Sequence, residues 1–330
     1  MPTGVYFRVQ LGGVTGHGDF ARDSGWVLQP SQCVPAAAAV VRVFIAHGDR
    51  TDRKRARLKY LLDAWGIERF VAEVERELEF APLRLAPELC RPRGPIAKHG
   101  HIGVHAQKQP GLSYVGVVLP AGRLSLAQLR GLADISESFG SGTIRLTVWQ
   151  NLLLSDIPNE HLVEVEAAIH ALGLPTAASA IRGGLVACTG NSGCKFSATD
   201  TKGQALQLAE YLDRRINLDQ PINIHLTGCP NSCAQHYVGD IGLLGVKVGA
   251  ELEEGYTIVV GGGAGSDRAL AHEIFPLVPM SEVPRTIERM LLRYLARRQE
   301  RESFYQFCRR HAVAELRTIF DGVATEPVPR

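Results

Sequence analysis

The sequence predicts an α+β protein of roughly two domains that contains an internal repeat. Its 330 residues correspond to roughly two domains at about 150 residues each, and segments with strand and helix periodicity alternate along the chain. The chain is 45% hydrophobic and 21% charged, with a formal net charge of +2, as is ordinary for a globular protein. A disordered chain and a strongly basic nucleic-acid-binding protein are therefore excluded.

Membrane insertion and export are also not expected. No stretch approaches the roughly 18 consecutive apolar residues that a membrane helix requires. The first residues, MPTGVY, lack the basic and apolar regions of a signal peptide. We therefore expect a cytoplasmic protein with no membrane and no nucleic-acid partner.

Residues 1–80 are predicted to form the end of a first half-domain. Residues 5–11 are rich in branched and aromatic side chains and predict a strand that ends at Gly12 and Gly13. Helical periodicity follows over residues 35–47, 52–64 and 67–79. Residues 81–98 contain four prolines and no sustained period, so they are interpreted as a linker.

Residues 99–174 predict a ferredoxin-like half-domain with the order βαββα. Residues 114–119 and 143–148 are predicted strands, and Ser125 is a predicted cap for the helix between them. A third strand is expected from Leu152, and a helix over residues 160–172 follows it.

The remaining chain predicts an α/β domain over residues 175–322, with a tail at 323–330. Its strand at 256–260 is followed by three helical stretches, at 282–298, 302–310 and 312–320. Residues 4–13 resemble residues 255–263, about 250 positions later, and each copy precedes three helices. Two full repeats need about 500 residues, so we interpret the chain as the end of one repeat followed by one whole repeat.

Four of the seven cysteines occur in pairs on two predicted loops at strand ends. Cys188 and Cys194 enclose five residues, and Cys229 and Cys233 enclose three. The other cysteines are isolated in the sequence and are interpreted as inert thiols, namely Cys33, Cys90 and Cys308. A disulfide scaffold is excluded, because seven cysteines are few for a chain of this length and one would stay unpaired.

Four thiolates suit either zinc or an iron–sulfur cluster. Zinc sites usually hold cysteine pairs two to four residues apart, whereas a five-residue loop encloses a bulkier group. Gly190, Gly193 and Gly228 would let backbone amides approach cluster sulfides. The spacing therefore favours an iron–sulfur cluster whose ligands converge on one centre, with zinc and four unliganded thiols as alternatives.

The motifs around these cysteines resemble the paired signatures of the siroheme-dependent nitrite and sulfite reductase family. They are CTGNSGCKF at 188–196 with DTK at 200–202, and TGCPNSC at 227–233 with GDIG at 239–242. Further similarity lies in RTDRK at 50–54 and TIRLTVWQN at 143–151. The resemblance covers nearly the whole chain, and the cysteine motifs are its most specific part.

The resemblance implies a 4Fe–4S cluster on Cys188, Cys194, Cys229 and Cys233, with Cys233 bridging to the iron of siroheme. It implies six-electron reduction of nitrite to ammonia, with electrons from ferredoxin or a similar one-electron donor. It also implies cationic partners for the siroheme carboxylates and the anion, for which the candidates are Arg53, Lys54, Lys59, Arg145 and Arg182. The pseudo-two-fold repeat would place siroheme between two halves.

Several alternatives remain at this point. Thr189, Gly190 and Asn191 after the first cysteine favour nitrite over sulfite, and a sulfite reductase is the second reading. A precorrin-3B synthase-like enzyme, a non-catalytic 4Fe–4S electron-transfer module and a zinc-stabilised protein are the others. The glycine run at 261–265 does not complete a dinucleotide motif, because Ser266 stands where the last glycine is needed.

The resemblance also implies that these residues lack the family's first ferredoxin-like half. We expect a separate chain to supply it, and we expect siroheme binding to be poor without it. The strands at 114–119 and 143–148 are expected to expose apolar surface toward that half.

Overall fold

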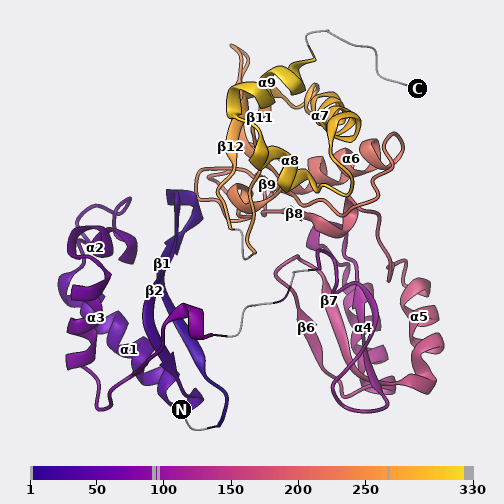
Figure 1. The fold of residues 1–330 in the computed structure, drawn as a ribbon. Helices are drawn as coiled ribbons and strands as arrows, with labels where there is room; N and C mark the ends of the chain where they lie inside the picture. The colour runs from indigo at the N-terminus through magenta and orange to yellow at the C-terminus, as the bar shows by residue number, and fades with distance from the viewer. Residues whose placement is uncertain (1–2, 91–93, 95–96, 266–267, 323–330) are drawn as a thin grey trace. The chain divides into compact units, whose positions relative to one another are not determined.

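The computed structural model describes residues 3–90, 94, 97–265 and 268–322. The chain divides into two compact units, Met1–Gly94 and Pro95–Arg330 (Figure 1). The division falls inside the proline-rich segment at 81–98. Among the described residues, no helix is both long enough and apolar enough to cross a lipid bilayer.

The first unit packs three helices against a small antiparallel sheet. Its strands β1 (Phe7–Val14), β2 (Asp19–Leu28) and β3 (Leu83–Arg84) pair in that order. The helices are α1 (Pro30–His47), α2 (Leu58–Trp65) and α3 (Ile67–Arg76). Trp26 of β2 is fully buried in this core and donates its indole N–H to Glu75 at 2.9 Å.

This unit corrects three sequence predictions. The first strand does not end at Gly12 and Gly13 but runs through them, and both adopt a positive φ. Helix α1 begins at Pro30 rather than at residue 35, because proline is favoured at the first helical position. Helix α2 begins at Leu58 rather than at residue 52, because residues 51–55 form turns.

The second unit begins with the ferredoxin-like half. It contains β4 (Gly103–Ala106), β5 (Leu112–Val117), α4 (Leu126–Phe139), β6 (Ile144–Leu146), β7 (Leu152–Pro158) and α5 (Leu162–Ala171). The sheet order is β4-β5-β7-β6, and every pair is antiparallel. The predicted order βαββα is confirmed, with β4 as an additional edge strand. Ser125 caps α4 by accepting the Gln128 N–H.

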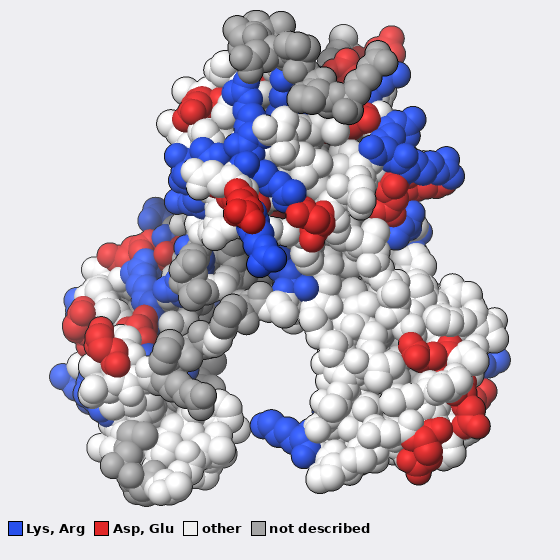
Figure 2. Space-filling view, turned by 45° about the vertical axis from the view of Figure 1, so that its right-hand side comes forward, with Lys and Arg blue, Asp and Glu red and all other residues white. Residues whose placement is uncertain are grey.

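Of the two strands predicted to expose apolar surface in this half, only one does so. β5 is largely buried, so the expectation that residues 114–119 expose apolar surface is wrong. β6 lies at the sheet edge, and Leu146 and Val148 are 82% and 85% exposed. The visible face of this half carries few charged side chains in Figure 2.

The rest of the second unit is built on a five-stranded sheet of order β12-β11-β10-β9-β8. The strands β8 (Leu185–Ala187), β9 (Ile224–Thr227) and β10 (Ile241–Val248) are parallel. The strands β11 (Glu253–Val260) and β12 (His272–Pro279) are antiparallel to their neighbours. The helices are α6 (Thr201–Asp213), α7 (Val283–Arg297), α8 (Phe304–Arg310) and α9 (Val313–Asp321).

The repeat predicted from the sequence is visible as a repeated order of elements. In each copy, an antiparallel hairpin precedes three helices: β1, β2 and α1–α3 in the first, and β11, β12 and α7–α9 in the second. The second strand of the hairpin was missed in both copies. β2 contains several charged residues, which are not typical of a buried strand. β12 contains Pro276 and Pro279, which are tolerated because β12 is an edge strand.

Candidate metal centre

The two cysteine loops leave the same edge of the five-stranded sheet. Cys188 directly follows β8, and Cys229 follows β9 after one intervening glycine, Gly228. The two strands are parallel neighbours, with Ala187 opposite Leu226. The loops are joined at their start, because the Gly228 N–H donates to the Cys188 Sγ at 3.3 Å.

The four predicted ligands are brought into one region. Burial raises the pKa of the Cys233 thiol, and the nearby Cys188, Cys229 and Cys194 thiols raise it further. Cys233 is exposed and Cys229 is buried, while the other two are partly buried.

The arrangement can be tested against the size of the bound group. No three His, Cys, Asp or Glu side chains in the described ranges lie close enough to hold one metal ion. A single zinc ion would draw its thiolates together, at bonds of about 2.3 Å. A 4Fe–4S cluster binds four thiolates around a larger group than a single ion.

Close packing explains two of the loop glycines. A Cβ at Gly190 would lie 2.9 Å from the Thr201 N atom, and Gly190 also has a φ of +75°. A Cβ at Gly228 would lie 1.7 Å from the Ser197 Oγ. These glycines therefore let the two loops and the start of α6 approach one another.

The start of α6 faces Cys188. Asp200 caps the helix by accepting the Gly203 N–H, and the Thr201 hydroxyl donates to the Cys188 carbonyl at 2.7 Å. The Thr201 Oγ1 also lies 3.6 Å from the Cys188 Sγ. The first residue of α6 therefore contacts both the backbone carbonyl and the sulfur of Cys188.

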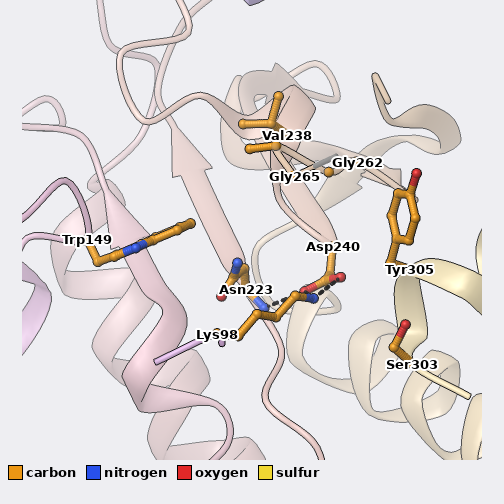
Figure 3. A pocket seen from close by; sticks show the side chains of 11 residues that line it. Lys98, Trp149, Asn223, Val238, Asp240, Gly262, Gly265, Ser303 and Tyr305 are labelled. Atoms are coloured by element: carbon orange, nitrogen blue, oxygen red, sulfur yellow. Dashed lines mark hydrogen bonds and ion pairs between the residues drawn. The ribbon is translucent and has the colours of Figure 1, made fainter. Parts of the chain in front are cut away.

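A cavity of about 190 Å³ lies in the same unit, at the other ends of β9 and β10 (Figure 3). Lys98 reaches into it, and its Nζ lies 2.6 Å from both carboxylate oxygens of Asp240. Asp240 is 1% exposed in its side chain and also accepts the Asn223 N–H at 2.7 Å. The other lining residues are Trp149, Val238, Gly262, Gly263, Ala264, Gly265, Ser303 and Tyr305.

Sequence reasoning missed Lys98 and Gln150. Lys98 lay in the predicted linker, so nothing local pointed to its carboxylate partner. The Gln150 side chain pairs with the backbone of Ala187, donating to its carbonyl at 2.7 Å and accepting its N–H at 3.1 Å. Gln150 thus fixes the residue before Cys188 from the ferredoxin-like half, and the signal available was its place in the motif at 143–151.

Three of the five predicted cations have partners outside the cysteine loops. Arg182 binds Asp213 at 2.6 Å, and Lys59 binds Asp63 at 2.8 Å. The Arg145 Nε donates to Ser155 at 3.2 Å. Arg53 and Lys54 lie exposed in the turn before α2. Within the described ranges, no hydrogen bond or ion pair joins any of the five predicted cations to the cysteine loops.

Comparison with known families covers most of the chain. The model described as "Nitrite/Sulfite reductase ferredoxin-like half domain" matches residues 105–172. The model described as "Nitrite and sulphite reductase 4Fe-4S domain" matches residues 2–81 and 180–325. One model therefore matches on both sides of the ferredoxin-like half, in agreement with the repeat.

Individual relatives agree with the family models. The chain is 37% identical over 272 residues to "Ferredoxin--nitrite reductase" of Synechococcus elongatus, covering 82% of this chain and 52% of the relative. It is 39% identical over 307 residues to "Sulfite reductase [ferredoxin] 2" of Mycolicibacterium paratuberculosis, covering 90% and 54%. The chain thus spans about half the length of these curated relatives.

A solved structure supports the same assignment. The structure of the Mycobacterium tuberculosis NirA protein superposes with a TM-score of 0.82 at 35% identity, covering 90% of this chain and 56% of that one. The chain therefore belongs to the nitrite and sulfite reductase family, whose cofactors are a 4Fe–4S cluster and siroheme.

Proposed function

We propose that this chain is the cluster-bearing part of a siroheme enzyme that reduces nitrite to ammonia with six electrons from ferredoxin. The observation that carries the proposal is the grouping of four cysteine thiols on two adjoining loops at one sheet edge. Relatives named ferredoxin–nitrite reductases support ferredoxin as the donor.

In this proposal Cys188, Cys194, Cys229 and Cys233 hold the cluster. Cys233 would also hold the siroheme, because it is the exposed member of the four. When bound, the cluster and siroheme would supply one-electron transfer chemistry. The chain's own residues orient the cofactors and keep the four thiols together.

The cationic partners proposed for the siroheme carboxylates and the anion now separate into two groups. Lys59 and Arg182 are already neutralised by carboxylates. Arg53, Lys54 and Arg145 form no ion pair with a carboxylate among the described residues, so they are the better candidates. Lys98 is assigned no substrate role, because Asp240 neutralises its charge.

Nitrite is the preferred substrate and sulfite the second candidate. The run Thr189, Gly190 and Asn191 supports nitrite. The mycobacterial relative named a sulfite reductase, at 39% identity over 90% of this chain, supports sulfite. Steady-state assays with reduced methyl viologen on the enzyme containing both halves test the choice. We expect a higher kcat/KM for nitrite, and a higher value for sulfite would reverse the assignment.

We propose further that the family's other half, on a separate chain, completes the siroheme site. The support is the apolar edge of the ferredoxin-like sheet, where Leu146 and Val148 are 82% and 85% exposed at or beside the edge strand β6. Co-purification of this chain with the product of a neighbouring gene tests this proposal. A complete enzyme that contains no second chain would contradict it.

A further inference from the structure

One carboxylate outside the cysteine motifs, that of Glu254, accepts hydrogen bonds from three groups in and beside the first cysteine loop. Glu254 of β11 accepts the Asn191 side-chain amide at 2.6 Å on its Oε1. Its Oε2 accepts the Asp200 backbone N–H at 3.0 Å and the Gln204 side-chain amide at 2.6 Å. Lys247 on the paired strand lies 3.9 Å from the Oε1.

The first of these bonds acts on the middle of the loop. Asn191 stands three residues after Cys188 and three before Cys194. Its backbone N–H donates to the Thr199 carbonyl at 2.9 Å, while its side chain donates to Glu254. The loop between the two cysteines is therefore held at its midpoint by both backbone and side chain.

The other two bonds act on the start of α6, which faces Cys188. Asp200 is the capping residue of this helix, and Gln204 lies in its first turns. Glu254 therefore links the loop midpoint to the helix terminus that contacts Cys188. The three segments meet on a strand that belongs to neither cysteine motif.

The chemistry requires an acceptor at this position. Tyr256 is fully buried, and burial raises the pKa of its hydroxyl, which stays protonated and donates to the Gln204 Oε1 at 2.5 Å. The amide nitrogen of Gln204 must then point at Glu254. Three donors converge on Glu254, so a group that itself donates would face at least one of them.

We propose that Glu254 is a positioning residue that fixes the Cys188–Cys194 loop for the iron–sulfur cluster and thereby sets the cluster's retention and reduction potential. The inference rests on the cluster binding proposed above. Residues that orient ligands from outside the ligand set change metal affinity or activity by about 10- to 100-fold when replaced. A fixed negative charge beside the loop also disfavours the addition of an electron to the cluster.

The test compares three single variants of the full chain carrying a reconstituted cluster under anaerobic conditions. Glu254→Gln removes the negative charge. It also places an amide N–H₂ donor where three other donors already point, namely those of Asn191, Asp200 and Gln204. Asn191→Ala removes the side-chain amide that donates to Glu254, and Asn191 is an exposed residue of the loop. Glu253→Gln is the matched control, because it removes the same charge from the neighbouring, exposed residue of β11.

We expect iron release to a chelator to be about 10-fold faster in Glu254→Gln and in Asn191→Ala than in the unmodified chain. The double variant Glu254→Gln with Asn191→Ala should release iron no faster than the faster single variant, because Glu254→Gln already disrupts the hydrogen bond that Asn191→Ala removes. The cluster's midpoint potential should shift upward in Glu254→Gln. Glu253→Gln should change neither quantity.

Unchanged iron release in Asn191→Ala, additive effects in the double variant, or equal effects in Glu253→Gln and Glu254→Gln would overturn the proposal. Asn191→Ala decides the case if Glu254→Gln does not fold, because Asn191 lies on an exposed loop. Hydrogen exchange of the cluster-free chain separates this inference from the proposed function. Faster exchange of the Asn191 and Cys194 amides in Glu254→Gln supports positioning even if the unmodified chain binds no cluster, and unchanged exchange contradicts it.

Discussion

Cys233 and Cys308 provide a direct contrast between a candidate ligand and an inert thiol. Cys233 is exposed beside three other thiols, whereas Cys308 on α8 is 2% exposed in the hydrophobic core. We expect Cys233→Ser to lose the cluster, because a serine hydroxyl is a poor replacement for a thiolate ligand. Iron content and visible absorption measure this, with Cys308→Ser as the control that keeps its iron. Full iron content in Cys233→Ser would remove Cys233 from the ligand set.

His236 makes the stability of the second unit depend on pH. Burial and, to a smaller extent, the nearby His225 together lower the pKa of this fully buried side chain to about 4. In the unfolded chain its pKa is about 6.5, so the unfolded state binds the proton more readily as pH falls. We expect its contribution, on the order of 3 kcal/mol, to be present above pH about 6.5 and lost by pH about 4.

Urea unfolding at pH 7.5, 6 and 5 measures this dependence. His236→Asn removes the titrating group and retains a side chain that can bond the Ser232 hydroxyl, which lies 3.0 Å from the His236 Nδ1. Its free energy of unfolding should fall less steeply between pH 6.5 and 5 than that of the unmodified chain. Parallel pH profiles for the two proteins would show that His236 does not titrate in this way.

At the scale of elements, Gln150 takes the place of a neighbouring strand for part of β8. β8 is the edge strand of its sheet, and the Gln150 amide satisfies both backbone groups of the fully buried Ala187. Gln150→Ala leaves these groups without that partner, and we expect a loss of about 1–3 kcal/mol in the free energy of unfolding. Chemical denaturation measures it against Gln10→Ala, an exposed position of β1. Equal stabilities of the two variants would contradict the role.

Elements whose signals are local could be predicted from the sequence. Ser125 caps α4 as expected, and α7 spans 283–297 against a predicted 282–298. The hairpin strand β2 could not be predicted, because its charged residues form ion pairs with residues that lie far away in the sequence. Arg8 on β1, for example, binds Asp23 at 2.5 Å.

The same distinction applies to the candidate site. The four cysteines are recognisable because each pair is a short motif on one loop. Lys98 and Asp240 are 142 positions apart, and Glu254 reaches Asn191 across 63 positions. Such pairs form only when the sheet brings its strands together, and no local pattern in a single sequence indicates them.

At the scale of the whole molecule, the edge of the ferredoxin-like sheet is unusually apolar. Leu146 and Val148 are 82% and 85% exposed at or beside the edge strand β6. An edge strand leaves backbone donors and acceptors available for pairing with another chain or segment. This is the surface that we expect the other half of the enzyme to cover.

The last prediction concerns residues 1–330 on their own. Siroheme carries eight carboxylates, and each buried ion without a partner costs several kcal/mol. Among the cations predicted here, Lys59 and Arg182 are already paired with Asp63 and Asp213, which leaves too few to neutralise the macrocycle. We therefore expect these residues to hold their cluster but to bind less than one siroheme per chain and to sustain no nitrite reduction.

Expression with siroheme synthesis supplied tests this expectation, with the Soret absorption reporting siroheme and methyl viologen oxidation reporting turnover. Adding the family's other half should restore both signals. Leu146→Lys and Val148→Lys should weaken that restoration, because they place charges on the apolar edge that the other half covers. The single chain's own cluster should be unaffected, because both residues belong to the ferredoxin-like half and not to the cysteine loops. Stoichiometric siroheme with sustained turnover in the single chain would show that 330 residues suffice for the reaction.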